Sequence, residues 1–269
     1  MHRNPHPIAQ TILRYLAIGG LAGLGCASAE TISLVTDPWC PYACQPDSDR
    51  PGYMIELAKA VFEPMGHSVE YRIMPFARAV TEVEQGKAFG LVGEQQVPER
   101  AGLIFPKVEQ GQAKACFYTS QTSTWRYTDQ ASLKKQRIGT INTYVYGAEL
   151  DTALAAAGPV VSTGYGDQAL INNVKKLEAK RLDAIVEYEA VIAYKMKTES
   201  GFNKLRQAGC AKQASNIYIP FSPIAPNAGS YAQVLADGMK TLRQNGKLAA
   251  ILARYGLRDW QSPGATAGR

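Results

Sequence analysis

Histidine is scarce in this chain of 269 residues, which holds only three. His2 and His6 lie in an N-terminal stretch that we expect to be removed, so the mature chain keeps His67 alone. One histidine excludes a two-histidine zinc motif. It also argues against a Ser-His-Asp triad, because His67 follows Met65 and Gly66 in a turn before a predicted strand. We interpret His67 as a surface residue.

Other signatures are also missing. The sequence has no P-loop and no Gly-rich dinucleotide motif, so we expect no nucleotide cofactor, and we expect no other cofactor or metal. Lysines and arginines are scattered and form no long basic run, which argues against a nucleic-acid partner. No segment after the N-terminal stretch is apolar enough to cross a bilayer.

The first 29 residues read as a cleaved signal peptide. Arg3 and Arg14 give a positive start, residues 15–24 form a short apolar run, and residues 27–29 (ASA) match a cleavage site. The mature chain then begins at Glu30 and is exported to the periplasm.

Cys26 opens an alternative, lipid attachment, but Gly23 stands where that pattern usually has leucine. We adopt the cleaved, soluble form. About 240 residues remain, enough for one large domain or two lobes, and the formal net charge falls from +6 to +4.

Four cysteines remain in the mature chain, and an even number in an exported protein indicates two disulfides. Three pairings are open, of which we favour Cys40–Cys44 and Cys116–Cys210. In the chain-entropy model the short loop contributes roughly 2 kcal/mol and the long loop about 5 kcal/mol. A zinc site of four thiols is the alternative, and export to an oxidising compartment argues against it.

An aromatic loop lies between the first predicted strand, 32–35, and the first predicted helix, 55–62. It holds Trp39, Tyr42 and two of the cysteines, Cys40 and Cys44. A loop at the carboxyl end of a strand is where α/β folds bind ligands, so the two rings form a candidate platform for a small molecule. The alternative is that both rings cap the core.

The rest of the chain alternates between strand and helix patterns, which indicates an α/β fold. Further strands are predicted at 69–74, 88–92, 103–105, 113–119, 137–141, 160–162, 182–187 and 216–221. Further helices are predicted at 75–84, 148–157, 168–180, 188–197, 231–244 and 248–255. Two successive α/β units are joined by the runs 113–119 and 216–221. This order predicts two hinged lobes with a ligand cleft between them.

An ordered set of short motifs covers nearly the whole mature chain. They are 36–39 (TDPW), 52–58 (GYMIELA), 97–100 (VPER), 181–187 (RLDAIVE), 218–222 (YIPFS), 242–246 (LRQNG) and 251–256 (ILARYG). The set resembles the bacterial extracellular solute-binding proteins of family 3, which have the periplasmic type II binding fold.

The resemblance implies two lobes, each a mostly parallel sheet flanked by helices, joined by two hinge strands. We place lobe 1 at 30–115 and 218–261, lobe 2 at 116–217, and a disordered tail at 262–269.

The resemblance also implies ligand-binding roles. In amino-acid binders of this family, the arginine at the position of Arg100 holds the α-carboxylate, which a guanidinium takes through two parallel hydrogen bonds. The alternative is a salt bridge to Glu99 or Glu94. Thr143 and Tyr144 lie in a loop before a helix, where backbone amides add donors.

Glu187 stands near the family's acidic ligand for an α-ammonium. The match to the family position could be shifted by one residue, in which case Tyr188 takes the place of Glu187. The alternative is that Glu187 is simply a carboxylate exposed at a strand end. Trp39 and Tyr42 supply stacking in this interpretation.

Two departures from the family pattern argue against a standard polar amino acid as the ligand. Val97 replaces the usual Thr, and Gly93, Glu94 and Gln95 replace small hydroxyl residues, with Gln95 kept as a candidate ligand residue. Arg78 lies where a branch of the family has a W-x-R motif. It either faces the cleft as a second guanidinium or faces solvent.

These features predict a monomeric periplasmic protein that binds an amino acid or related carboxylate and delivers it to an ABC transporter permease. One alternative is a dehydratase-like enzyme with Glu94 and Glu187 as acid and base. The other is a sensor that acts through a separate receptor. The candidate ligand-binding residues are Trp39, Tyr42, Arg78, Gln95, Arg100, Thr143, Tyr144 and Glu187.

Overall fold

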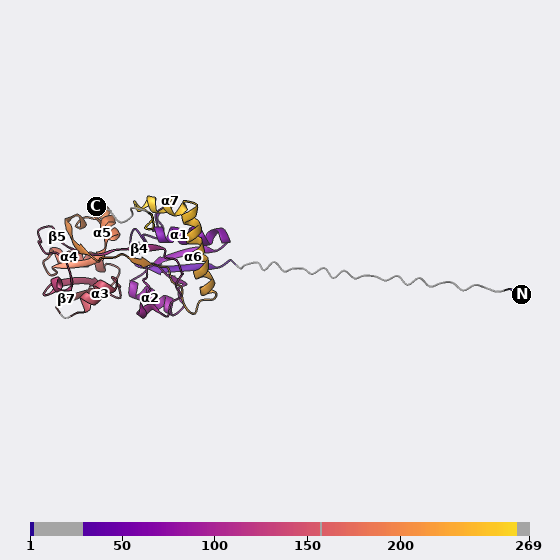
Figure 1. Cartoon of the computed structure of the whole chain (residues 1–269), viewed down its shortest axis with the longest axis horizontal. Helices are drawn as coiled ribbons and strands as arrows, with labels where there is room; N and C mark the ends of the chain where they lie inside the picture. Colours follow the sequence, from indigo (N-terminus) through magenta and orange to yellow (C-terminus); the bar gives the residue numbers. More distant parts are fainter. Residues whose placement is uncertain (3–28, 157, 263–269) are drawn as a thin grey trace.

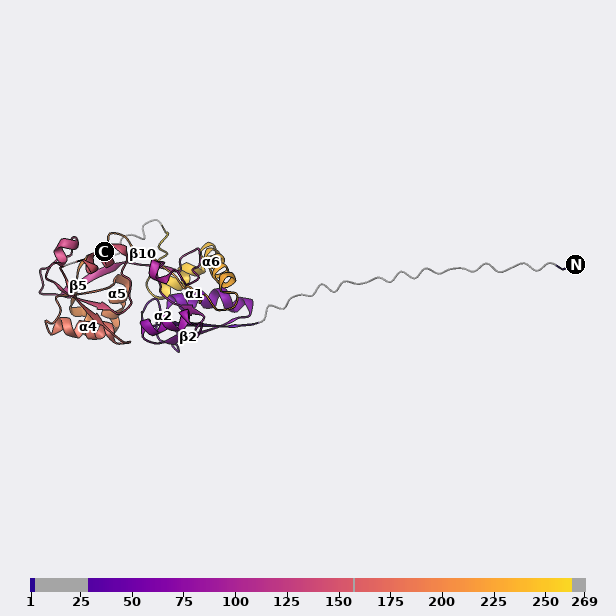
Figure 2. The same ribbon diagram turned by 90° about the horizontal axis from the view of Figure 1, so that it is seen from below.

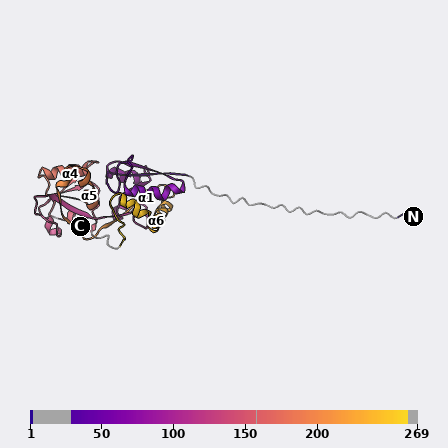
Figure 3. The same ribbon diagram turned by 90° about the horizontal axis from the view of Figure 1, so that it is seen from above.

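The computed structural model describes residues 1–2, 29–156 and 158–262. The predicted signal peptide and tail lie almost entirely outside the described residues. Figure 1 shows two lobes, one holding α1, α2, α6 and α7 and the other holding α3, α4 and α5, with β4 between them. The views from below and from above show the same two bodies (Figures 2 and 3).

Lobe 1 is built on a three-stranded parallel sheet in the order β2-β1-β3. Its strands are β1 (Thr31–Thr36), β2 (Ser68–Ile73) and β3 (Gly90–Leu91). Its helices are α1 (Tyr53–Phe62), α2 (Phe76–Glu84), α6 (Ala228–Gln244) and α7 (Lys247–Arg254). Parallel strands end at one edge, so the loops after β1 and β3 emerge side by side.

Apolar spacing explains the packing of this lobe. Ile32, Leu34 and Val35 of β1 are fully buried, as the apolar run predicts. The helices α1, α6 and α7 pack together, while α2 packs on β1 and β3 over a separate apolar cluster. This arrangement fixes the sheet edge from which the aromatic loop leaves.

Lobe 2 holds a five-stranded mixed sheet in the order β7-β6-β8-β5-β9. Its strands are β5 (Ala115–Ser120), β6 (Arg137–Ile141), β7 (Val160–Gly164), β8 (Ala184–Tyr188) and β9 (Leu205–Cys210). Its helices are α3 (Ala148–Ala155), α4 (Ala169–Glu178) and α5 (Glu189–Thr198). Strand β6 runs parallel to β7 and β8, whereas β5 is antiparallel to β8 and β9.

Short 3₁₀ helices complete the described structure, at Glu63–Met65, Pro98–Arg100, Gln130–Leu133 and Phe202–Lys204. None of the described helices is both long and apolar enough to span a bilayer.

The chain passes between the lobes at a two-stranded antiparallel pair, β4 (Gly111–Ala113) with β10 (Ser215–Ile217). The run predicted as one strand, 113–119, is broken at Lys114, where the backbone leaves the hinge pair and enters the lobe 2 sheet. The predicted strand 103–105 is wrong: only an isolated bridge between Ile104 and Phe221 is present.

The described residues contain two disulfides, Cys40–Cys44 and Cys116–Cys210, which is the pairing favoured from the sequence. The first closes the aromatic loop. The second joins β5 to β9, where Cys116 and Cys210 are paired in register.

Candidate functional site

A pocket lies where the two lobes meet. Lobe 1 contributes the loops that follow β1 and β3, and lobe 2 contributes the loop after β6 and the end of β8. The lining residues are Thr36, Asp37, Trp39, Phe76, Val92, Gly93, Glu94, Gln95, Tyr144, Val145 and Tyr188. The open volume is about 10 Å³, about the room for one water molecule. The lobes are therefore closed on one another.

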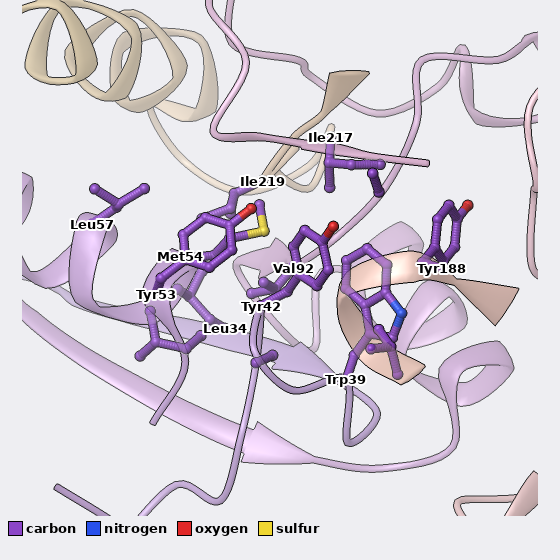
Figure 4. Packing of buried hydrophobic residues seen from close by; sticks show 14 of the residues in the cluster. Leu34, Trp39, Tyr42, Tyr53, Met54, Leu57, Val92, Tyr188, Ile217 and Ile219 are labelled. Carbon is purple, nitrogen blue, oxygen red and sulfur yellow. The ribbon is translucent and has the colours of Figure 1, made fainter. Parts of the chain in front are cut away.

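Aromatic rings form one wall of this pocket. Trp39 stacks on Tyr42 with ring centroids 3.9 Å apart, and it meets Tyr188 edge to face at 5.1 Å. Figure 4 shows the three rings in a row, with Trp39 between Tyr42 and Tyr188. Gly93 makes this possible, because a Cβ there would lie 2.9 Å from the Trp39 ring. Phe76 and Tyr144 form a second edge-to-face pair at 5.1 Å.

Asp37 is a buried carboxylate on the lobe 1 side. The Tyr144 hydroxyl of lobe 2 donates a hydrogen bond of 2.6 Å to its Oδ2. Burial raises the pKa of Asp37 to about 6, and the hydrogen bond from Tyr144 opposes this rise. No cation balances the carboxylate among the pocket-lining residues that the structure describes.

Glu187, at the end of β8, is fully buried behind Trp39. Its Oε1 accepts hydrogen bonds from the Trp39 indole N–H at 3.4 Å and from the Tyr188 backbone N–H at 2.8 Å. Its Oε2 is buried and has no hydrogen-bond partner in the described part of the chain. Burial raises the pKa of Glu187 to about 8, and the nearby Asp37 adds to the rise.

Arg100 and Glu94 form an ion pair beside the pocket. The Arg100 Nε–H donates to Glu94 Oε2 at 2.6 Å, and Nη2 donates to the Thr143 carbonyl of lobe 2 at 3.2 Å. The side chains of Arg100 and Glu94 are only 11% and 3% exposed. Burial raises the pKa of Glu94, and the guanidinium opposes this rise. Arg100 thus joins the lobes while its charge is matched by Glu94.

Gln95 is a further link between the lobes. Its amide donates to the Val145 carbonyl at 2.8 Å and to the Tyr188 hydroxyl at 2.7 Å. The Tyr188 hydroxyl also donates to the Val145 carbonyl. A polar network therefore spans the cleft beside the aromatic wall.

The structure separates the residues predicted from the sequence into three groups. Trp39, Gln95 and Tyr144 line the pocket. Next to it lie Tyr42, whose hydroxyl donates to the Gln112 carbonyl, together with Arg100, Thr143 and Glu187.

Arg78 lies apart from the pocket. Its side chain is 67% exposed and pairs with Glu82 along α2 at 2.9 Å, which matches the solvent-facing alternative. We therefore leave Arg78 out of the proposed site.

Sequence reasoning did not select Asp37, Phe76 or Val145 as ligand-binding residues. Asp37 had a usable signal, since it follows β1 at the edge where α/β sheets bind ligands. Tyr188 was considered only as the residue that would replace Glu187 if the match to the family position were shifted by one residue. Across the described residues, no group of three or more His, Cys, Asp or Glu side chains is placed to hold a metal ion.

Solved structures share the fold over most of the chain. An amino acid ABC transporter substrate-binding protein, AbpA from Streptococcus pneumoniae, bound to L-arginine, is 17% identical with a TM-score of 0.67, covering 84% of this chain and 94% of that one. A putative L-cystine ABC transporter from Listeria monocytogenes is 16% identical with a TM-score of 0.70, covering 84% and 96%.

A histidine kinase sensor domain with similarity to periplasmic binding proteins is 18% identical with a TM-score of 0.70, covering 84% and 95%. These identities establish the fold alone. The search of curated proteins gave no match.

A comparison with protein-family models establishes the family as well as the fold. The model of the bacterial extracellular solute-binding proteins, family 3, matches residues 32–258, which span both lobes and the hinge. The chain belongs to this family of solute-binding proteins.

Proposed function

We propose that this protein captures a small polar ligand in the pocket between its lobes, in the periplasm, and delivers it to an ABC importer. The observation that carries the proposal is the pocket itself. Both lobes contribute polar and aromatic side chains to it, and they do so at strand ends where α/β folds bind ligands.

Binding requires the lobes to open and close. The contacts that span the cleft include hydrogen bonds of Trp39, Gln95, Arg100 and Tyr144, together with the two edge-to-face aromatic pairs. The room left between them is too small for any ligand larger than water. Motion at the β4–β10 pair would separate these groups, as in hinge closure around a ligand. A ligand would then replace part of the contact between the lobes.

The importer role is supported by the family and by relatives whose names describe ABC transporter components. The similarity to a histidine kinase sensor domain keeps the sensor alternative open to test. The dehydratase alternative loses support because Glu94, one of its two proposed groups, is bound to Arg100.

Thermal-shift screening of the mature protein against amino acids, small carboxylates and small amines tests the proposal. A ligand that binds only the folded state raises the melting temperature in proportion to the logarithm of its concentration. We expect at least one class to do so, and Trp39→Ala to remove the shift. Mass spectrometry should show the ligand unchanged. A shift from no class, or turnover of the bound compound, would overturn the proposal.

A further inference from the structure

We propose that the ligand is a small organic cation, an amine or a guanidine, and that it binds best without a carboxylate of its own. This inference rests on the proposed function and names the ligand class of the same pocket. In this arrangement Asp37 and Glu187 are the counter-ions, and the aromatic wall receives the cation.

The charges around the pocket do not balance. Three buried carboxylates surround it, those of Asp37, Glu94 and Glu187. Within the described part of the chain, the guanidinium beside the pocket is that of Arg100, which is already paired with Glu94. No Lys or Arg occurs among the lining residues that the structure describes. Two carboxylates are therefore left without a cation.

Lys195 lowers the pKa of Glu187, but it does not form an ion pair with this carboxylate. Its ammonium pairs with Glu199, four residues further along the chain. Its influence on Glu187 is also the weakest of those that shift this carboxyl group.

Neutral groups, and no cation, donate to the carboxylates of Asp37 and Glu187 in the described structure. From the opposite lobe, Asp37 accepts from the Tyr144 hydroxyl and Glu187 accepts from the Trp39 indole. Within its own lobe, Asp37 accepts from the Thr36 hydroxyl and Glu187 from the Tyr188 backbone N–H. All four donors are neutral. A buried carboxylate is stable when it is paired with a cation, and a neutral donor offsets only part of its desolvation. The N–H groups of a bound cation can take these places.

The raised pKa values agree with this interpretation. Burial raises the pKa of Asp37 to about 6 and that of Glu187 to about 8, as expected of carboxylates that lack a cation. A cation bound between them would lower both values.

The wall of the pocket is rich in aromatic rings. Trp39, Phe76, Tyr144 and Tyr188 all line it. Aromatic rings attract cations through their electron-rich faces, most strongly when the cation is desolvated, and clusters of rings bind alkylated ammonium groups. Trp39 and Tyr188 lie next to each other at the lobe junction (Figure 4). The wall and the carboxylates select the same class of ligand.

A ligand carboxylate meets the opposite conditions. It would enter beside Asp37, whose pKa of about 6 leaves it ionised at neutral pH, and like charges at short range repel one another. Arg100 would have to leave Glu94 before it held the carboxylate in a bidentate pair. We therefore expect the pocket to discriminate against amino acids in favour of the amines that lack the carboxylate.

Calorimetric titration with matched probes tests this. Agmatine is arginine without its carboxylate, and cadaverine is lysine without its carboxylate. We expect at least one amine to bind the mature protein at least tenfold more tightly than its parent amino acid. Equal or tighter binding of both amino acids would overturn the inference and leave the solute-binding function intact. Failure of all four probes would also overturn it, and the thermal-shift screen then shows whether the function itself fails.

Asp37→Asn is the decisive variant. It keeps the size of the side chain and an oxygen for the Tyr144 hydroxyl while removing the charge. We expect it to weaken binding of the preferred amine at least tenfold, while Asp167→Asn, on an exposed site of lobe 2, leaves binding unchanged. Unchanged binding in folded Asp37→Asn, checked by circular dichroism, would contradict the assignment.

Tyr144→Phe supplies a second, opposite readout. It removes the neutral hydroxyl that competes for Asp37 and keeps the ring. We expect amine affinity to rise by about threefold or more, whereas a fall would contradict the proposed competition. This variant keeps the inference testable if Asp37→Asn fails to fold.

Discussion

Two arginine–carboxylate pairs of this protein use the same chemistry in different surroundings. Arg137 binds Asp183 through two side-chain hydrogen bonds of 2.9 and 2.7 Å, at side-chain exposures of 43% and 34%. Arg100 binds Glu94 through one contact of 2.6 Å, at exposures of 11% and 3%. The exposed pair has the better geometry, yet we expect the buried pair to matter more. Loss of one partner leaves a charge out of water only in the buried pair.

The comparison also bears on ligand choice. Arg137 and Asp183 lie at the start of β6 and just before β8, so their charges do not enter the cleft. Arg100 lies beside the pocket, but its Nε–H donates to the Glu94 carboxylate and its Nη2–H donates to the Thr143 carbonyl, so the guanidinium is already paired. A guanidinium near a binding site is therefore no sufficient sign of an anionic ligand.

The largest expected effect comes from Arg100→Ala. This substitution leaves Glu94 buried without its cation, and such a loss lowers the free energy of unfolding by about 3–5 kcal/mol. Urea denaturation measures it. The double variant Arg100→Ala, Glu94→Gln should recover most of the loss, because the orphaned charge is gone. No recovery would show that the loss comes from packing rather than from the pair.

The next effect is a pH dependence centred on Glu187. Its pKa of about 8 in the folded state exceeds its ordinary value of 4.5, so between roughly pH 5 and 8 the folded protein holds a proton that the unfolded chain has released. The folded state binds more protons in this window, so the free energy of unfolding falls as the pH rises through it, on the order of a few kcal/mol.

The groups that act on Glu187 set the size of this effect. Asp37 raises its pKa further, while the backbone N–H of Tyr188, the Trp39 indole and Lys195 lower it. Urea denaturation at pH 5, 7 and 9 should give a flatter profile for Glu187→Gln than for the unmodified protein. Glu70→Gln, on the exposed face of β2, is the matched control and should follow the unmodified protein. Parallel profiles for all three proteins would contradict the assignment.

The smallest effect is expected for Arg137→Ala. Water solvates both partners of this pair, so its loss should shift the urea midpoint far less than Arg100→Ala does. A loss as large as that of Arg100→Ala would break the comparison on which this account depends.

The sequence predicted the α/β alternation and two lobes, because these depend on local patterns. The hinge runs were predicted only in part, since the hinge strands are Gly111–Ala113 and Ser215–Ile217 and most of 113–119 belongs to the lobe 2 sheet. Both disulfides match the favoured pairing, although local patterns left three pairings open.

The sequence did not predict β9, since Arg206, Gln207 and Gly209 lack a strand pattern. Pairing with β5 and the Cys116–Cys210 bridge hold that segment extended. Such long-range contacts are invisible to local periodicity.

The residues of the candidate site also divide into those that local patterns predicted and those that depend on long-range contacts. Trp39 was selected by its position after a strand and Tyr144 by its place in a loop before a helix, and both line the pocket. The sequence offered Glu94 as a possible partner of Arg100, but no local pattern chooses between that carboxylate and a ligand. The contact from Tyr144 to Asp37 joins residues 107 positions apart, and it depends on how the lobes close.

The most direct test uses whichever amine binds more tightly, agmatine or cadaverine, and takes the ratio of its affinity to that of its parent amino acid, measured by calorimetry in the unmodified protein and in Glu94→Gln. Removing the Glu94 carboxylate frees Arg100 to hold a ligand carboxylate, so we expect the preference for the amine to fall at least tenfold. An unchanged ratio would show that the Arg100–Glu94 pair does not govern the choice of ligand, and would contradict the account.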